Sequence, residues 1–198
     1  EFSYCTIPNE LVPFDYQTFE AFPGHVEAGV TNLETGQAEY KEVTTEDKHF
    51  RLLQATCAMP LMFPVFHLDG KPYLDGGAAD AVPYRRAFEQ GCDRVVVILT
   101  KPRSFVRKPE RLLPLIQRRY REYPNFCRTM EERPERDNRS RAELFRLEKE
   151  GKALVIAPNT LHGVGRIEHN VDKLRMLWAE GYQQGMENME QIRSFMDR

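Results

Sequence analysis

The sequence predicts a three-layer α/β fold with a mostly parallel sheet. Segments of strand and helix character alternate after residue 26, an order typical of such folds. The run Val95–Leu99 is continuously apolar, which favours a strand covered on both faces. The segment that follows Pro83 and ends at Gly91 carries the start and stop signals of a helix. With 198 residues, 41% of them hydrophobic, no internal repeat and no linker, we expect one domain over 1–198.

The first part of the chain predicts an irregular segment followed by two strands. Residues 1–25 mix aromatic side chains with three prolines and show no period, so we expect them to pack irregularly on the core. A short helix is expected near Asp15–Ala21, and an amphipathic lid is the alternative for the segment. Residues 25–31 and 37–40 have strand character and are joined by the turn Glu34-Thr35-Gly36.

The stretch Lys71–Ala78 predicts a strand that ends in the turn Asp75-Gly76-Gly77. A short apolar helix, Leu52–Met59, precedes it and is ended by Pro60. Asp-Gly is a common turn pair because glycine adopts positive φ at little cost, so the triplet by itself predicts only a loop. Its position after a strand agrees with the rule that functional loops of α/β sheets gather at strand ends.

The segment 101–121 carries eight Lys or Arg residues against one acid. Four apolar side chains within it are spaced as one face of a helix: Leu112, Ile116, Tyr120 and Tyr123. The opposite face is therefore cationic. It is interpreted either as a solvated face paired with acids elsewhere, or as a site of weak contact with phospholipid head groups at a membrane surface.

The C-terminal part predicts two further helices around a strand. A charge-dense helix begins at Asn138 or Ser140 and ends before Gly151. The apolar run over 153–158 predicts a buried strand, and apolar residues at helical spacing after Asn170 predict a final helix.

Composition excludes several classes of function. A net charge of −2 gives no bias toward nucleic acid, and no apolar stretch approaches the roughly 18 residues that span a bilayer. The four cysteines lack C-x-x-C spacing and the histidines are scattered, so we expect no metal and no cofactor. The apolar surroundings of Cys57 and Cys92 predict small core residues. Free thiols favour a reducing compartment, and we expect a cytoplasmic protein, with peripheral membrane contact left open.

The order of these elements resembles the patatin-like phospholipase family, and more narrowly its bacterial branch of predicted esterases. Four features carry the resemblance: a helix ended by Pro60, the Asp75-Gly76-Gly77 turn after a strand, a helix begun at Pro83 and a V-V-V-I strand. The segment T-N-L-E-T-G at 31–36 fits the same pattern, and most of the chain from residue 26 on is covered. The resemblance implies that Asp75 is the base of a Ser–Asp dyad, with Gly76 and Gly77 supporting the motif.

The activity implied by the resemblance is that of a serine lipid acyl hydrolase, of the phospholipase A or esterase type, acting on a lipid or ester substrate. The family nucleophile is the serine of a G-x-S-x-G turn, and none of the four serines here has a glycine two residues away. The glycine-rich oxyanion loop of the family is not found either. We therefore expect 1–198 to be the C-terminal portion of a patatin-like catalytic domain, incomplete at its N-terminus.

Two consequences follow for function. The partner of this piece would be the N-terminal part of the same protein, which carries the serine, and the piece alone would show no esterase turnover. The alternative is a non-catalytic lipid- or protein-binding module that retains the patatin-like fold.

Overall fold

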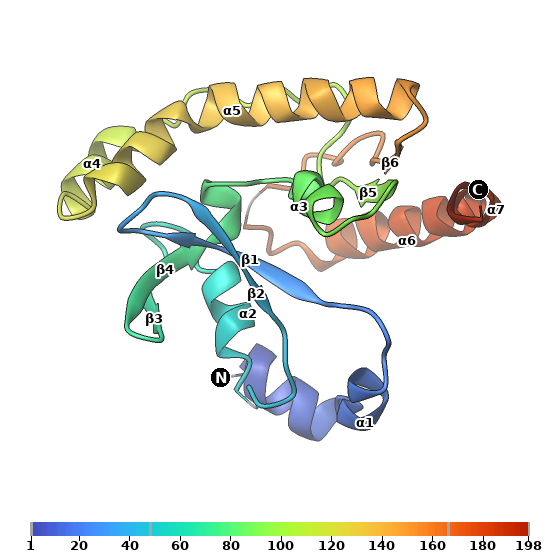
Figure 1. The fold of residues 1–198 in the computed structure, drawn as a ribbon, viewed down its shortest axis with the longest axis horizontal. Helices are drawn as coiled ribbons and strands as arrows, with labels where there is room; N and C mark the ends of the chain where they lie inside the picture. The colour runs from blue at the N-terminus through green and yellow to red at the C-terminus, as the bar shows by residue number, and fades with distance from the viewer. Residues whose placement is uncertain (1, 48, 166, 198) are drawn as a thin grey trace. The chain divides into compact units, whose positions relative to one another are not determined.

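The computed structural model describes residues 2–47, 49–165 and 167–197 (Figure 1). The chain divides into two compact units: a first unit of Glu1–Ala81 with Lys108–Asp137, and a second unit of Val82–Arg107 with Asn138–Arg198. Both units combine strands with helices, so the predicted mixed α/β class is confirmed. The expectation of a single domain stays a prediction.

The first unit is built on a four-stranded sheet in the order β2-β1-β4-β3. In chain order its strands are β1 (Glu27–Asn32), β2 (Ala38–Glu42), β3 (Phe66–Leu68) and β4 (Lys71–Asp75). Every neighbouring pair is antiparallel. The prediction of a mostly parallel sheet is therefore wrong for this sheet.

Short connections explain two of the three antiparallel pairs, β1 with β2 and β3 with β4. Asp69 and Gly70, which join β3 to β4, have φ angles of 52° and 77°. Positive φ at both positions is the geometry of a two-residue hairpin turn. In the loop between β1 and β2, Gly36 has a φ of 71°. Such turns return the chain directly beside itself, whereas parallel neighbours need a crossover of about a dozen residues or more.

Helices cover the sheet of the first unit through alternating strand residues. The fully buried Val30 and Tyr73 pack in one cluster with Leu52 of helix α2 (Arg51–Thr56). Leu74 belongs to another cluster, together with Ile116 of α4 (Leu113–Arg119). Because successive strand residues point to opposite faces, both faces of β4 are packed up to the residue before Asp75.

The N-terminal segment is more regular than its sequence predicts. Residues Phe2–Leu11 form a π-helix, η1. The short helix expected near Asp15–Ala21 is confirmed as α1 (Tyr16–Glu20), and Oδ1 of Asp15 accepts the Thr18 N–H at 2.9 Å. This bond satisfies one of the backbone donors that a helix N-terminus leaves free.

The second unit contains a small parallel sheet of β5 (Val95–Ile98) and β6 (Ala153–Ile156). Tyr84 of α3 (Tyr84–Glu89) packs in its core with alternate residues of both strands. Ile98 is 74% exposed, so the expectation that β5 is covered on both faces is wrong. An apolar run fits a buried strand, but its composition alone does not show how many faces are covered.

Helix α5 (Pro124–Lys149), the long yellow-to-orange helix in Figure 1, begins earlier than the predicted Asn138 or Ser140. It continues through Pro134, and Arg136 donates to the Thr129 carbonyl at 3.1 Å in the turn before this proline. Pro134 has no N–H to donate to the Met130 carbonyl, so the helix lacks one of its own backbone bonds here.

Two further helices complete the second unit: α6 (Val171–Glu187) and α7 (Met189–Met196). The predicted start of α6 is confirmed, because Oδ1 of Asn170 accepts the N–H groups of Asp172 and Lys173 at 3.0 and 3.1 Å. None of the helices in the described ranges is both long and apolar enough to cross a membrane.

Candidate functional site

Asp75 is the last residue of β4 and stands opposite Val30 in the register of β1. Its backbone N–H donates to the Ala58 carbonyl, with an N···O distance of 2.9 Å. Its own carbonyl accepts the Thr31 hydroxyl at 2.8 Å. The backbone of Asp75 is thus held from two sides where the chain leaves the sheet. The strand-end placement agrees with the sequence analysis, while its role as a base stays a prediction.

The side chain of Asp75 organises the turn that follows. Its Oδ1 accepts the Gly77 N–H at 2.7 Å and caps the 3-10 turn η2 (Gly76–Ala78). An aspartate commonly accepts from its own backbone two residues on, because its side chain is short. The residue is half-buried, and among the residues that the structure describes no donor contacts Oδ2. The turn therefore fixes one oxygen of this carboxylate.

The two glycines fit closely around this carboxylate. A β carbon at Gly76 would overlap the Gly29 carbonyl oxygen and lie 2.5 Å from the carbonyl carbon. At Gly77 a β carbon would lie 3.1 Å from Oδ1 of Asp75. A side chain at Gly76 would push η2 away from β1, and one at Gly77 would crowd the carboxylate that caps the turn.

The Thr31 hydroxyl forms hydrogen bonds with the residues at both ends of the turn. The sequence did not identify Thr31 as part of the site. It is fully buried. Besides donating to the Asp75 carbonyl, its Oγ1 accepts the Ala79 N–H at 3.1 Å. The sequence segment T-N-L-E-T-G predicts only a strand end and a turn, because the hydroxyl acquires its partners when β1 pairs with β4.

A polar network ties three strands together beside the turn. Asn32 of β1 donates to Oε1 of Glu39 at 2.7 Å, and the Tyr73 hydroxyl of β4 donates to Oε2 at 2.6 Å. Burial alone would raise the pKa of Glu39, but the bonds from Tyr73 and Asn32 outweigh it and hold that pKa below its ordinary value. Burial and then the bond to Glu39 raise the pKa of Tyr73. The network therefore keeps Glu39 ionised and Tyr73 protonated.

Two arginines of α5 border the turn. Arg136 donates to the Ala78 carbonyl at 2.6 Å and so holds the end of η2. Nη2 of Arg133 is 3.7 Å from the point where a β carbon of Gly77 would lie, and its Nε is 3.6 Å from Oδ2 of Asp137. The Asp75 turn is thus flanked by positive charge. The dense alternation of charge along 131–150 gave no sign that these two side chains face a site.

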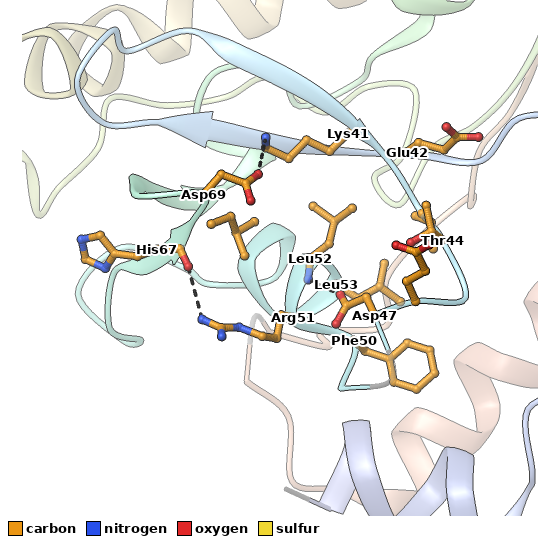
Figure 2. Close-up of a pocket in the computed structure, with 13 residues that line it drawn as sticks. Lys41, Glu42, Thr44, Asp47, Phe50, Arg51, Leu52, Leu53, His67 and Asp69 are labelled. Atoms are coloured by element: carbon orange, nitrogen blue, oxygen red, sulfur yellow. Dashed lines mark hydrogen bonds and ion pairs between the residues drawn. The ribbon is translucent and has the colours of Figure 1, made fainter.

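A cavity of about 620 Å³ lies elsewhere in the first unit, between α2 and the strands β2 and β3 (Figure 2). Lys41 and Asp69 on its wall approach to 3.8 Å, and Arg51 donates to the His67 carbonyl at 3.2 Å. Asp75 does not line it, and the described residues that do include no serine or cysteine. The charged groups of this cavity hold its walls together, and we assign it no chemistry.

The described residues offer no metal site, and none of their cysteine side chains forms a hydrogen bond with the Asp75 turn. Within the described ranges, no group of three His, Cys, Asp or Glu residues is placed to hold a metal ion. Cys57 and Cys92, predicted as core residues, are both exposed. Each comes after the end of a helix, Cys57 after α2 and Cys92 after α3. Beyond a helix end, apolar neighbours in the sequence do not predict whether a side chain is buried.

Comparison with known families matches one stretch in each half of the chain. Residues 4–88 match the family described as Patatin-like phospholipase, so the resemblance that the motifs predict is confirmed over this stretch, which includes the Asp75 turn. This match indicates a family of lipid acyl hydrolases and hydrolase chemistry of the esterase type. Residues 123–197 match a Domain of unknown function, DUF6363. No curated protein matches the chain.

Proposed function

We propose that Asp75 is the general base of a Ser–Asp dyad in a serine lipid acyl hydrolase of the phospholipase A or esterase type. The observation that carries this proposal is the asymmetric carboxylate: Oδ1 accepts the Gly77 N–H at 2.7 Å, while no described donor contacts Oδ2. A general base must be held in place and still offer a lone pair to the proton that it accepts. The patatin-like match over residues 4–88 supports the assignment, because it contains this turn.

In this proposal the serine belongs to a part of the protein outside residues 1–198. The serines of the present sequence are Ser3, Ser104, Ser140 and Ser194, and none stands in a G-x-S-x-G turn. The serine segment and this chain together would form the three-layer catalytic domain, with residues 1–198 as its C-terminal portion.

The proposed reaction has two steps. Oδ2 of Asp75 accepts the serine proton while the serine oxygen attacks the ester carbonyl, and the alcohol leaves with that proton as the acyl-enzyme forms. In the second step Asp75 takes a proton from water as the resulting hydroxide attacks the acyl carbonyl. Asp75 then returns this proton to the departing serine oxygen, which releases the fatty acid and restores the serine hydroxyl. Gly76 and Gly77 carry no side chain that would block the approach of the serine.

The test measures hydrolysis of a short-chain nitrophenyl ester by the product of the complete gene. Asp75→Asn keeps the Oδ1 acceptor but removes the base, so kcat should fall by about 10²–10⁴-fold. Purified residues 1–198 alone should show no turnover.

A matched control is Asp69→Asn, which removes the same charge at the β3–β4 turn, where the Asp69 side chain is 88% exposed. Asparagine tolerates positive φ, so this variant should keep wild-type activity. Equal activity of Asp75→Asn and the wild type would falsify the proposal. A complete gene product without a G-x-S-x-G segment would favour the non-catalytic binding module instead.

A further inference from the structure

Helix α4 presents an exposed face on which leucines lie between arginines. Its members, which we call the α4 patch, are Arg111, Leu112, Leu115, Arg118 and Arg119. The helical turn begins before α4 itself, because the Ile116 N–H donates to the Leu112 carbonyl at 2.9 Å. Spacings of three, four and seven residues place Leu112, Leu115, Arg118 and Arg119 on one side. Arg111 lies in the turn just before α4, where the Leu113 N–H donates to the Glu110 carbonyl at 3.2 Å.

The arginines of this patch have few partners. Among the residues that the structure describes, the side chains of Arg111 and Arg118 make no hydrogen bond or ion pair. The Arg119 guanidinium lies over the Tyr120 ring, 5.6 Å from its centroid. Residues 108–121 contain five cationic residues and one acid. The sequence also allowed segment 101–121 to be a solvated face whose cations pair with acids. Arg103 fits this interpretation, because its Nη2 is 2.6 Å from Oε1 of Glu148, but the arginines of the patch do not.

The leucines of the patch are exposed although the opposite side of α4 is firmly packed. Leu112 and Leu115 are 53% and 50% exposed, whereas Ile116 and Tyr120 are 3% and 2% exposed. The Tyr120 hydroxyl also accepts the Leu61 N–H at 3.0 Å. Because α4 is fixed in this way, Leu112 and Leu115 stay exposed to water, which is unfavourable in free energy. Burying both side chains in an apolar phase would be favourable.

The buried side of α4 belongs to the core around the Asp75 turn. Ile116 and Tyr120 lie in one cluster with Leu74 and Ala78, which precede and follow that turn. The helix that carries the patch and the strand end that carries Asp75 therefore share one packed core.

We propose that the α4 patch docks on the surface of an anionic phospholipid bilayer. The arginines would meet lipid phosphates while Leu112 and Leu115 enter the boundary between head groups and acyl chains. Charge complementarity selects an anionic partner, and the leucines between the arginines select a lipid surface over a nucleic acid, which offers no apolar phase to bury them. The proposal does not depend on the chemistry of Asp75.

Cosedimentation of the chain with vesicles tests this directly. Vesicles of phosphatidylglycerol and phosphatidylcholine in equal amounts should bind about tenfold or more tightly than phosphatidylcholine alone, and sodium chloride should weaken the binding. Arg111→Gln with Arg118→Gln should reduce affinity by about tenfold or more, since each arginine contributes to surface attraction. Leu112→Ser with Leu115→Ser should reduce it by about tenfold.

Control variants distinguish a specific loss of vesicle binding from misfolding and from a general effect of changing the surface. All four positions are exposed, so both double variants should melt like the wild type. Leu174→Ser with Arg175→Gln makes the same kinds of change on the exposed face of α6, where Leu174 is 43% exposed, and should leave binding intact. Asp75→Asn should also bind normally, which separates this proposal from the catalytic one.

Several results would overturn the proposal. These are equal binding to both vesicle types, unchanged binding of both double variants, and a loss in the α6 control as large as that in the α4 variants. Binding to a DNA duplex that the arginine variant loses and the leucine variant keeps, without vesicle binding, would identify a nucleic-acid site instead.

A tryptophan reporter locates the inserted residue. The chain contains one tryptophan, Trp178, on α6. In the variant Trp178→Phe with Leu115→Trp, the emission should shift to the blue on adding the anionic vesicles and be quenched by brominated acyl chains. Emission that does not change on vesicle binding would show that Leu115 stays in water.

Discussion

At the scale of single residues, Gly76 sets how closely the Asp75 turn approaches β1. The atoms that a β carbon would meet belong to the backbone of Gly29 and Val30, so no change of rotamer would relieve the contact. We expect Gly76→Ala to lower the free energy of unfolding by about 1–3 kcal/mol, as overpacking does in other cores. Urea unfolding measures this change.

Gly181→Ala is the matched control for this prediction. Gly181 lies within α6 and a β carbon there would meet nothing within 4 Å. Alanine is the better helix former, so the free energy of unfolding should stay the same or rise by up to about 1 kcal/mol. If Gly76→Ala were as stable as the wild type, the close approach to β1 would be refuted.

The residues of the site differ in how far the sequence predicts them. Asp75 could be found because it follows a recognisable strand and belongs to a motif with neighbours on both sides. Thr31 could not, because it bonds to Asp75 across 44 residues of sequence. Its partners exist only once the register of β1 on β4 is known, and no local pattern encodes that register.

At the scale of elements, the Glu39 network makes the packing of three strands sensitive to acid. The pKa of Glu39 lies below its ordinary value of 4.5, so ionised Glu39 stabilises the fold above that pH. This contribution should be lost as the pH falls through the lowered pKa, when the carboxylate gains a proton. We therefore expect part of the acid destabilisation of the chain to come from this side chain.

Glu39→Gln isolates this contribution, because glutamine keeps an acceptor for Tyr73 but carries no charge. The variant should be less stable than the wild type at neutral pH and should lose less stability between about pH 5 and the acid limit. Urea unfolding at a series of pH values gives both curves. Parallel curves for the two proteins would mean that Glu39 does not couple folding to pH.

The sheet shows why elements can be predicted more reliably than their pairing. The strands β1, β2 and β4 lie close to the segments expected from their patterns, and β5 and β6 pair in parallel as an α/β fold requires. Connection length accounts for the antiparallel pairs β1–β2 and β3–β4, but not for the pairing of β1 with β4. Asp69-Gly70 between two apolar runs was the available signal, since this dipeptide favours a two-residue hairpin.

At the scale of the whole molecule, the family matches and the two units have different boundaries. The patatin-like match ends at residue 88, beyond Ala81, where the first stretch of the first unit ends. The second match begins at residue 123, within the first unit, and ends at 197 in the second. Helix α5 likewise begins in one unit and ends in the other. Because one helix belongs to both units, we predict that they unfold together.

Calorimetry of two core variants tests this cooperativity. Leu74 of the first unit and Leu144 of the second are both fully buried. Each change to alanine should cost about 2–5 kcal/mol by removing packed methyl groups. If α5 couples the units, either variant should shift one common transition, by roughly 2–4 °C for each kcal/mol. Two transitions, each moved by only one of the substitutions, would instead show that the units unfold separately. A cavity lowers the melting temperature only of the cooperatively unfolding unit that contains it.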